Sequence, residues 1–149
     1  MRRHLRKGGT RAGAMRQAQA AEASLIRALT RTARAVTLRI EPLLKTEGLT
    51  LDGWLVLDAL VAGDGLTMTE LAGRTLVTGP TLTRVVDRLV TTAAAYREVD
   101  AEDRRRVRVY LAPRGRSAYQ RASAKLAELE EELDPGGEVL AKLVSVDPG

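Results

Sequence analysis

The spacing of apolar residues predicts a helix over Thr78–Val90. Its apolar positions repeat with the period of an α-helix, and they are Leu82, Val85, Val86, Leu89 and Val90. This period places them on a single face. Thr81, Arg84 and Arg88 fall on another face. The pattern therefore predicts a helix that docks through one side and leaves polar groups free on the other.

A second helix is predicted immediately before it, over about Thr67–Leu76, with Thr67 or Thr69 as its N-cap. Only a few residues separate the two helices. Thr78 is expected to cap the later helix, and Pro80 suits a first turn, where the missing N–H is tolerated. Two helices joined by so short a link are typical of a helix-turn-helix.

An arginine-rich hairpin is predicted after the second helix, with strands over Tyr96–Val99 and Val107–Leu111. The second strand alternates apolar and polar residues, as a half-buried strand does. Asp-Ala-Glu-Asp-Arg-Arg-Arg lies between the strands. Adjacent arginines repel one another unless an anion is near, and guanidinium groups suit phosphates and narrow minor grooves. The alternative is a solvated turn that its acidic neighbours partly neutralise.

Helix, turn, helix and basic hairpin in this order are typical of a winged helix-turn-helix, a DNA-reading fold. Candidate contacts in the recognition helix are Thr78, Gly79, Pro80, Thr81, Thr83, Arg84 and Arg88. Candidate wing contacts are Asp103, Arg104, Arg105 and Arg106, and the preceding helix adds Thr69 and Arg74. We expect Arg84, Thr81 and Thr83 to read the major groove and Arg88 to meet phosphate. Arg105 is expected to enter the minor groove, positioned by an ion pair with Asp103.

Further helices are expected on both sides of this region. Helical spacing marks the segments Ala14–Leu44, Thr50–Ala62, Pro113–Leu133 and Glu138–Val146. Pro42 is expected to end or kink the first of them. The outer helices have more apolar surface than one winged domain can cover, so we expect a homodimer. Two recognition helices about one DNA turn apart would then read a near-palindrome.

These elements predict a mainly α fold with a small β-hairpin wing (α+β). The expected parts are a basic, disordered arm over 1–13, a winged helix-turn-helix over 45–112, and a dimerisation region over 14–44 and 113–149. Three interpretations of the basic start stay open. It is an arm that touches DNA phosphates, a dispensable solubilising tail, or an overlong gene model whose true start is Met15.

Composition and charge agree with a nucleic-acid binder. The 149 residues, 44% of them hydrophobic, suffice for one domain with its own core. Residues 1–16 hold six basic and no acidic groups, and residues 74–121 hold eleven basic against five acidic groups. Such a concentration of positive charge is typical of proteins that bind nucleic acid.

Residue types disfavour an enzyme. Cysteine is absent and His4 is the sole histidine, so we expect no disulfide, metal site, cofactor or nucleophile–histidine pair. No apolar run has transmembrane length, so no membrane contact is expected. The expected location is the cytoplasm, in association with the nucleoid.

Residues 49–116 resemble the MarR family of bacterial regulators. The wing pattern Asp-x-Arg-x-x-x-Val-x-Leu is met by Asp103, Arg105, Val109 and Leu111, and Pro113 and Gly115 match the start of the next helix. The recognition-helix pattern is met by Thr78, Pro80, Thr81, Thr83, Arg84, Asp87, Arg88 and Leu89. The resemblance implies a dimeric winged helix-turn-helix transcription regulator, most commonly a repressor.

Two places depart from the family pattern. Family members usually carry Gly-Leu-Val between recognition helix and wing, where this chain has Ala93, Ala94 and Ala95. Losing glycine at a helix C-terminus is expected to cost about 1 kcal/mol. The smaller alanine side chains leave space at the corner between recognition helix and wing, and Tyr96 is the candidate to fill it. Ala112 replaces the usual threonine, so the next helix is expected to lack a side-chain cap worth about 1 kcal/mol.

MarR-like repressors commonly bind small, often aromatic, anionic ligands between the dimer helices and the winged domain. The resemblance therefore makes Arg34, Arg39 and Trp54 candidate ligand residues. The alternatives are that Trp54 belongs to the core and that the arginines lie on a solvated face. A competing function is a low-specificity architectural DNA-binding protein, whose affinity would come mainly from phosphates.

Overall fold

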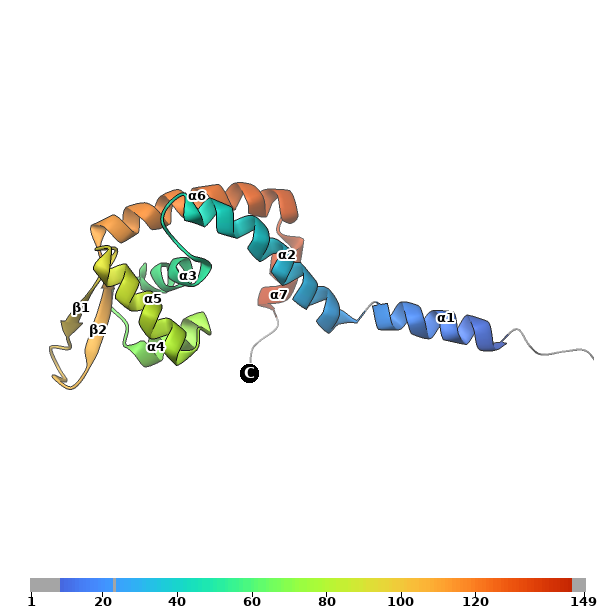
Figure 1. The fold of residues 1–149 in the computed structure, drawn as a ribbon, viewed down its shortest axis with the longest axis horizontal. Helices are drawn as coiled ribbons and strands as arrows, with labels where there is room; N and C mark the ends of the chain where they lie inside the picture. Colours follow the sequence, from blue (N-terminus) through green and yellow to red (C-terminus); the bar gives the residue numbers. More distant parts are fainter. Residues whose placement is uncertain (1–8, 23, 146–149) are drawn as a thin grey trace, which may run out of the picture. The chain divides into compact units, whose positions relative to one another are not determined.

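The computed structural model describes residues 9–22 and 24–145, while residues 1–8, 23 and 146–149 lie outside the described residues (Figure 1). Its elements are α1 (Gly9–Glu22), α2 (Leu25–Lys45), α3 (Leu51–Leu60), α4 (Met68–Thr75), α5 (Gly79–Thr91), β1 (Ala95–Val99), β2 (Val107–Leu111), α6 (Pro113–Leu133) and α7 (Glu138–Val144). The mainly helical fold with one small hairpin is therefore confirmed. The elements form two units, residues 1–39 and 40–149, which are described separately.

The first unit holds α1 and most of α2. These two helices replace the single long helix expected over residues 14–44. Ser24 begins α2, because its carbonyl accepts the N–H of Ala28 (2.9 Å), and serine favours helix starts. The described part of the expected arm, residues 9–13, is helical in α1, and the disorder expected of the arm stays a prediction. The rest of the arm lies outside the described residues.

Pro42 lies within α2 and does not end it, since the helix continues to Lys45. One missing N–H leaves the other bonds of the last turn intact. Apolar side chains along α2 are nevertheless exposed, and they are Leu25, Ile26, Leu29 and Leu38. Ile40, further along the helix, packs against the core instead.

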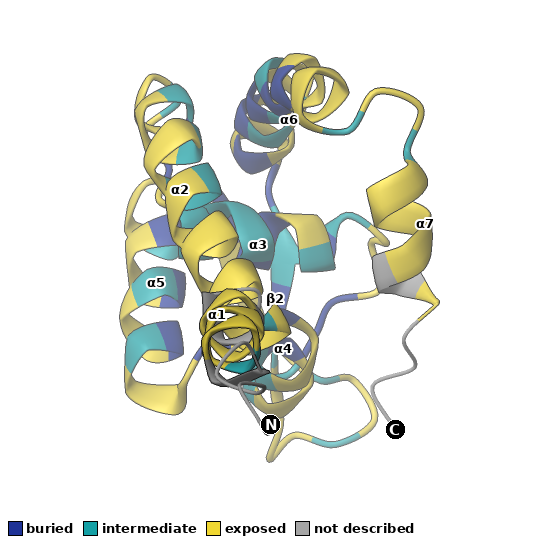
Figure 2. Ribbon diagram, turned by 90° about the vertical axis from the view of Figure 1, so that its right-hand side faces the viewer, coloured by how far each residue is buried: buried dark blue, intermediate teal, exposed yellow. Residues whose placement is uncertain are grey.

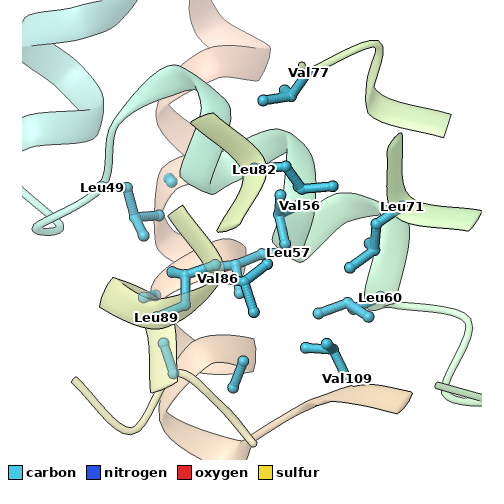
Figure 3. Close-up of a cluster of buried hydrophobic side chains, with 14 of the residues drawn as sticks. Leu49, Val56, Leu57, Leu60, Leu71, Val77, Leu82, Val86, Leu89 and Val109 are labelled. Carbon is cyan, nitrogen blue, oxygen red and sulfur yellow. The ribbon is translucent and has the colours of Figure 1, made fainter. Parts of the chain in front are cut away.

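The core of the second unit is built around α3. Thr50 caps this helix by accepting the N–H of Gly53 on its hydroxyl oxygen (3.0 Å). Val56, Leu57 and Leu60 are buried, and Figure 3 shows them among side chains from α4, α5 and β2. The helix is surrounded by neighbours, as its largely apolar circumference predicts.

The hairpin is antiparallel and joins the core through one additional bridge. Ala95 pairs with Leu111 at its base and Val99 with Val107 near its tip. Leu66, just before α4, exchanges two backbone hydrogen bonds with buried Val109 of β2 (3.0 and 2.8 Å). This bridge attaches the hairpin to the start of the helix-turn-helix.

Helix α6 packs on α3 through its buried side. Figure 2 shows its buried positions gathered on one side, whereas the described side chains of α7 are exposed. Trp54 of α3 stacks on Tyr119 of α6, with ring centroids 6.1 Å apart, and donates its indole N–H to Ser123 (3.3 Å). Tyr119 also donates to Asp58 of α3 (2.6 Å), and this carboxylate raises the pKa of the phenol.

A carboxylate also joins the loop after α2 to α6. Glu47 accepts from Lys125 (2.5 Å) and Arg121 (2.7 Å), and these bonds lower its pKa. At the far end of α6, Asp134 accepts the N–H groups of Leu140 and Val139, which lower its pKa and start α7. None of the described helices is long and apolar enough to cross a membrane.

Candidate nucleic-acid interface

Helix α5 is the predicted recognition helix, one residue longer at its C-terminus than expected. Thr78 occupies the N-cap position and Pro80 the first turn, as predicted. The Thr78 hydroxyl bonds to no backbone N–H of the helix; it lies 3.3 Å from the hydroxyl of Thr81. The first backbone N–H groups of α5 thus receive no side-chain cap, and an anion is the kind of partner that such a helix end attracts.

The two predicted faces of α5 are present. Leu82, Val86 and Leu89 are buried against the core (Figure 3). The candidate contacts are exposed, apart from half-buried Thr81, and they are Thr78, Gly79, Pro80, Thr83, Arg84 and Arg88. The apolar half of the helix therefore fixes its position while the polar half stays accessible.

Helix α4 begins with a capping box. The Thr67 hydroxyl accepts the N–H of Glu70 (3.2 Å), and the Glu70 carboxylate accepts the N–H of Thr67 (2.8 Å). The backbone and hydroxyl of Thr67 lower the pKa of Glu70. Of the two N-cap candidates, Thr67 is the one used, and Thr69 and Arg74 lie exposed on the helix.

The turn between α4 and α5 contains a residue in an unusual conformation. Leu76 caps α4 with φ +56° and ψ +17°, in the left-handed region, and its side chain is 86% exposed. Thr75 and Val77 on either side are buried, and the Thr75 hydroxyl accepts the N–H of Val77 (3.3 Å). The turn is thus held by its two neighbours while Leu76 projects into solvent.

The wing tip is organised around Asp100. Its carboxylate accepts the N–H groups of Glu102 (2.8 Å) and Asp103 (3.2 Å) and the guanidinium of Arg108 (2.5 Å). The bond from Arg108 and then the two backbone donors lower the pKa of Asp100 to about 2. Arg104, Arg105 and Arg106 follow as exposed residues.

The expected ion pair between Asp103 and the Arg105 side chain is wrong. Asp103 instead pairs with Arg106, three residues along (3.4 Å), and accepts the backbone N–H of Arg105 (3.0 Å). The short turn brings the backbone N–H of Arg105, and the guanidinium of Arg106, to the carboxylate. Asp103 therefore shapes the tip through the main chain.

Comparisons with known proteins agree on the identity of this arrangement. Residues 47–106 match the model of the MarR family. The transcriptional regulator BldR of Sulfolobus solfataricus is 26% identical, with a TM-score of 0.74 over 83% of this chain and 89% of that one. A MarR-family regulator from Silicibacter pomeroyi is 27% identical, with a TM-score of 0.71 over 84% and 86% of the chains.

Residues 47–106 thus match the MarR family of transcription regulators, and the described chain has the winged-helix fold of its members. MepR of Staphylococcus aureus, in a structure described as a complex with DNA, shares the fold at 23% identity, with a TM-score of 0.72 over 83% of this chain and 94% of that one. A comparison with curated proteins gives no match.

The chain departs from the MarR family pattern where the wing begins. Ala93 adopts φ +58°, the left-handed conformation that glycine would adopt more easily, as the substitution predicts. Ala94 and Ala95 are buried there. Tyr96 does not fill the corner: it is exposed and stacks on Tyr110, with centroids 5.3 Å apart. Adjacent strand residues point to opposite faces, so Tyr96 cannot join Ala95 inside.

A glycine at the start of α6 packs closely against the base of the wing. A Cβ on Gly115, at the start of α6, would lie 1.9 Å from the carbonyl oxygen of Ala94. That same oxygen accepts the N–H of Ala112 (3.0 Å), which occupies the N-cap position of α6 without a side-chain cap, as expected. The absence of a side chain at Gly115 therefore allows α6 to start directly on the base of the wing.

A cavity of about 270 Å³ lies beside the recognition helix. The start of α3 and its preceding loop form one wall, with Thr50 and Asp52, and α5 forms the other, with Arg84, Val85 and Arg88. Trp54 does not line it; its ring and N–H are engaged by α6. Arg34 and Arg39 belong to the first unit, and the ligand role of these three residues stays a prediction.

Arg108 is the residue of the wing that sequence reasoning missed. The alternating pattern places it only on a strand, yet its side chain contacts three separate segments of the fold. The available signal was an arginine at a polar position within the strand. Among the described residues no cluster of acidic or histidine side chains suits a metal ion.

Proposed function

We propose that this MarR-family regulator binds double-stranded DNA as a homodimer and represses transcription from a near-palindromic operator. The observation that carries the proposal is the division of α5, whose apolar side is buried while Thr83, Arg84 and Arg88 are exposed. The related MepR of Staphylococcus aureus, solved as a DNA complex, supports DNA as the partner. A helix so divided can enter a major groove without losing its packing.

On this proposal Arg84, with Thr81 and Thr83, reads base edges, and Arg88 meets phosphate. The exposed positions Thr69 and Arg74 of α4 fit contacts to the backbone of the same groove. Phosphate contacts position a protein on the duplex, whereas contacts with base edges supply specificity. The candidate contacts of α5 and α4 thus divide into readers and anchors.

In the wing, Arg105 enters the minor groove and Arg104 lies along phosphates. Both are exposed at the hairpin tip. Arg106 is partly neutralised by Asp103, so its contribution to phosphate binding is smaller than that of its neighbours. A narrow minor groove concentrates negative potential, which favours an inserted arginine in A·T-rich flanks.

Equilibrium binding tests this assignment. Duplexes selected from random sequence provide the operator. Arg84→Ala should weaken binding to it by about 1–3 kcal/mol. The same variant should bind a duplex whose base pairs facing α5 are mutated as tightly as the wild type does. Arg116→Ala, an exposed arginine on α6, is the control for loss of one charge. An equal loss on every duplex would make Arg84 a phosphate anchor.

The same selection separates specific regulation from architectural binding. A regulator should bind its selected duplex at least about 10³-fold more tightly than random DNA at fixed salt. An architectural protein should show little preference and a steep salt dependence. A reporter gene placed behind the selected duplex then tests repression, which requires lower expression when the protein is present.

The dimer is proposed from the exposed apolar side chains of α2. Leu25 and Ile26 are 71% and 77% exposed, and Leu133, Val139 and Leu140 of α6 and α7 are exposed as well. Burying such surface on a second copy follows the two-fold arrangement of most oligomers. Sedimentation at micromolar concentration should give a dimer, and Ile26→Glu should shift it toward monomer. A wild-type monomer would contradict both dimer and palindrome.

A small aromatic anion is proposed as a ligand of the cavity beside α5. Arg84 and Arg88 line that cavity, so an anion bound there occupies side chains that the DNA contact needs. Benzoate serves as a probe and should weaken DNA binding. Val85→Trp, which fills the cavity, should abolish the benzoate effect; an unchanged effect would place the ligand elsewhere.

A further inference from the structure

The side chain of Arg108 joins three segments that are distant in sequence. Its Nε donates to Asp100 at the wing tip (2.5 Å), and its Nη1 donates to the carbonyl of Gly65 (3.1 Å). The same Nη1 lies 3.5 Å from the carboxylate of Glu70, the capping residue of α4. A guanidinium is a planar fork of donors, so one rigid group links strand, tip and helix start.

Asp100 transmits this link to the tip. Its side chain is only 11% exposed and accepts two backbone N–H groups of the turn in addition to Arg108. Asp100 also donates its own N–H to the carbonyl of Arg106 (2.9 Å). The Asp100 carboxylate therefore holds the first half of the turn, and it is bonded in the same place to Arg108.

Gly65 provides the opposite anchor. It has φ +66°, and a Cβ there would lie 2.5 Å from the ring of Tyr110, so the ring covers the glycine closely. The next residue, Leu66, forms the backbone bridge to Val109. The base of the hairpin is thus attached to the α3–α4 connection by main chain, and its outer half is attached through Arg108.

We propose that Arg108 is a positioning residue, which holds the wing tip at a set place relative to the start of α4 so that Arg104 and Arg105 meet DNA already ordered. The proposal rests on the proposed function. Arg108 itself is only 26% exposed, and its Nε and Nη1 are engaged by the protein. Ordering a loop before binding removes that entropy cost from association.

The first test needs no DNA. Hydrogen exchange on the free protein should be faster at the Arg105 and Arg106 amides in Arg108→Leu and in Asp100→Asn than in wild type, while α5 amides stay protected. The control Arg116→Leu should leave the tip unchanged. Unchanged exchange at the tip in both variants overturns the proposal, whatever the protein binds.

The second test uses the duplex obtained by selection, in a long form and in a form truncated to the base pairs under α5. Arg108→Leu should lose about tenfold in affinity for the long form and little for the short one. Removing one phosphate contact lowers the slope of log affinity against log salt concentration by about one unit. Arg108→Leu should lower this slope by more than one unit. It should also abolish the protection of the flanking minor groove from hydroxyl radicals. A change of one unit in the slope, with the minor-groove protection intact, would show that Arg108 contacts a phosphate directly and would overturn the proposal.

The sign of a third result is decisive. Asp100→Asn removes a negative charge, so simple attraction predicts tighter DNA binding. Positioning predicts weaker binding to the long duplex, because Arg108 loses its charged partner. Arg108→Lys keeps the charge but not the planar fork of donors. It should fold, and its affinity for the long duplex should lie between those of wild type and Arg108→Leu. Tighter binding by Asp100→Asn overturns the proposal, whereas failure of wild type to select any duplex overturns the proposed function alone.

Discussion

The recognition helix and the wing are held in place by different forces. Leu82, Val86 and Leu89 anchor α5 by burying apolar surface. Beyond its base, the wing is held by charged groups, with Arg108 and Asp100 at the centre. Apolar burial changes little with salt, whereas partly exposed ion pairs are screened by it. The position of α5 should therefore be insensitive to salt, whereas the position of the wing should respond to it.

The largest effect is expected where α5 enters the core. Leu82→Ala should lower the free energy of unfolding by about 2–5 kcal/mol, because a fully buried side chain leaves a cavity. Urea denaturation at two salt concentrations measures it, and the loss should be the same at both. Thr83→Ala, exposed on the next position, should change stability by less than about 0.5 kcal/mol. If the destabilisation by Leu82→Ala depended on salt, α5 and the wing would not be held by different forces.

A smaller loss is expected at the junction of wing and α6. Gly115→Ala should destabilise the fold by about 1–3 kcal/mol, since the new Cβ meets backbone that cannot move aside easily. The matched control is Gly73→Ala in α4, where nothing lies within 4 Å of the new Cβ. That control should be neutral or stabilising by up to about 1 kcal/mol. Equal behaviour of the two variants would contradict the close approach at Ala94.

The wing should respond to acid where α5 does not. The pKa of Asp100 is lowered to about 2 from the ordinary 3.8, so its carboxylate stabilises the wing fully at pH values above 3.8. That contribution is lost as pH falls through about 2. Because its pKa is lowered, Asp100 is protonated only toward the lower of these pH values, and the amide NMR signals of Glu102 and Asp103 should shift there. In Asp100→Asn this shift should disappear; its persistence would assign the effect to another carboxylate.

The smallest effects are expected at Leu76, which caps α4, and at Ala93, just after α5, since both residues are left-handed. Replacing either by glycine should raise stability by up to about 1 kcal/mol, because the steric penalty exceeds the entropy that glycine loses. Thermal unfolding measures the gain. Leu76→Ala keeps the Cβ and should show no such gain. A gain in Leu76→Ala equal to that in Leu76→Gly would trace the effect to the exposed side chain.

Much of this architecture follows from local patterns. The helical period fixes the buried side of α5, and alternation locates β2 to the residue. Ala93 shows that even a strained position can be predicted from a missing glycine. The first two inferences use only neighbours along the chain, and the third uses the family pattern, so none of them needs coordinates.

Contacts between distant segments were not predictable in the same way. Arg108 bonds to Gly65 across 43 residues, and no sequence period reports such a pair. The partner of Asp103 was mistaken because a turn decides which adjacent arginine comes within reach. The start of α2 after Ser24 was also missed, since a serine within a helical run is only a weak boundary signal.

The single tryptophan of the chain has a practical consequence. Trp54 lies between α3 and α6, stacked on Tyr119 and bonded to Ser123. Its emission spectrum therefore reports one defined contact, without the averaging that several indoles would impose. A shift in emission maximum on adding a duplex or benzoate would register repacking between these helices. The native protein thus contains its own optical sensor, and no label needs to be attached.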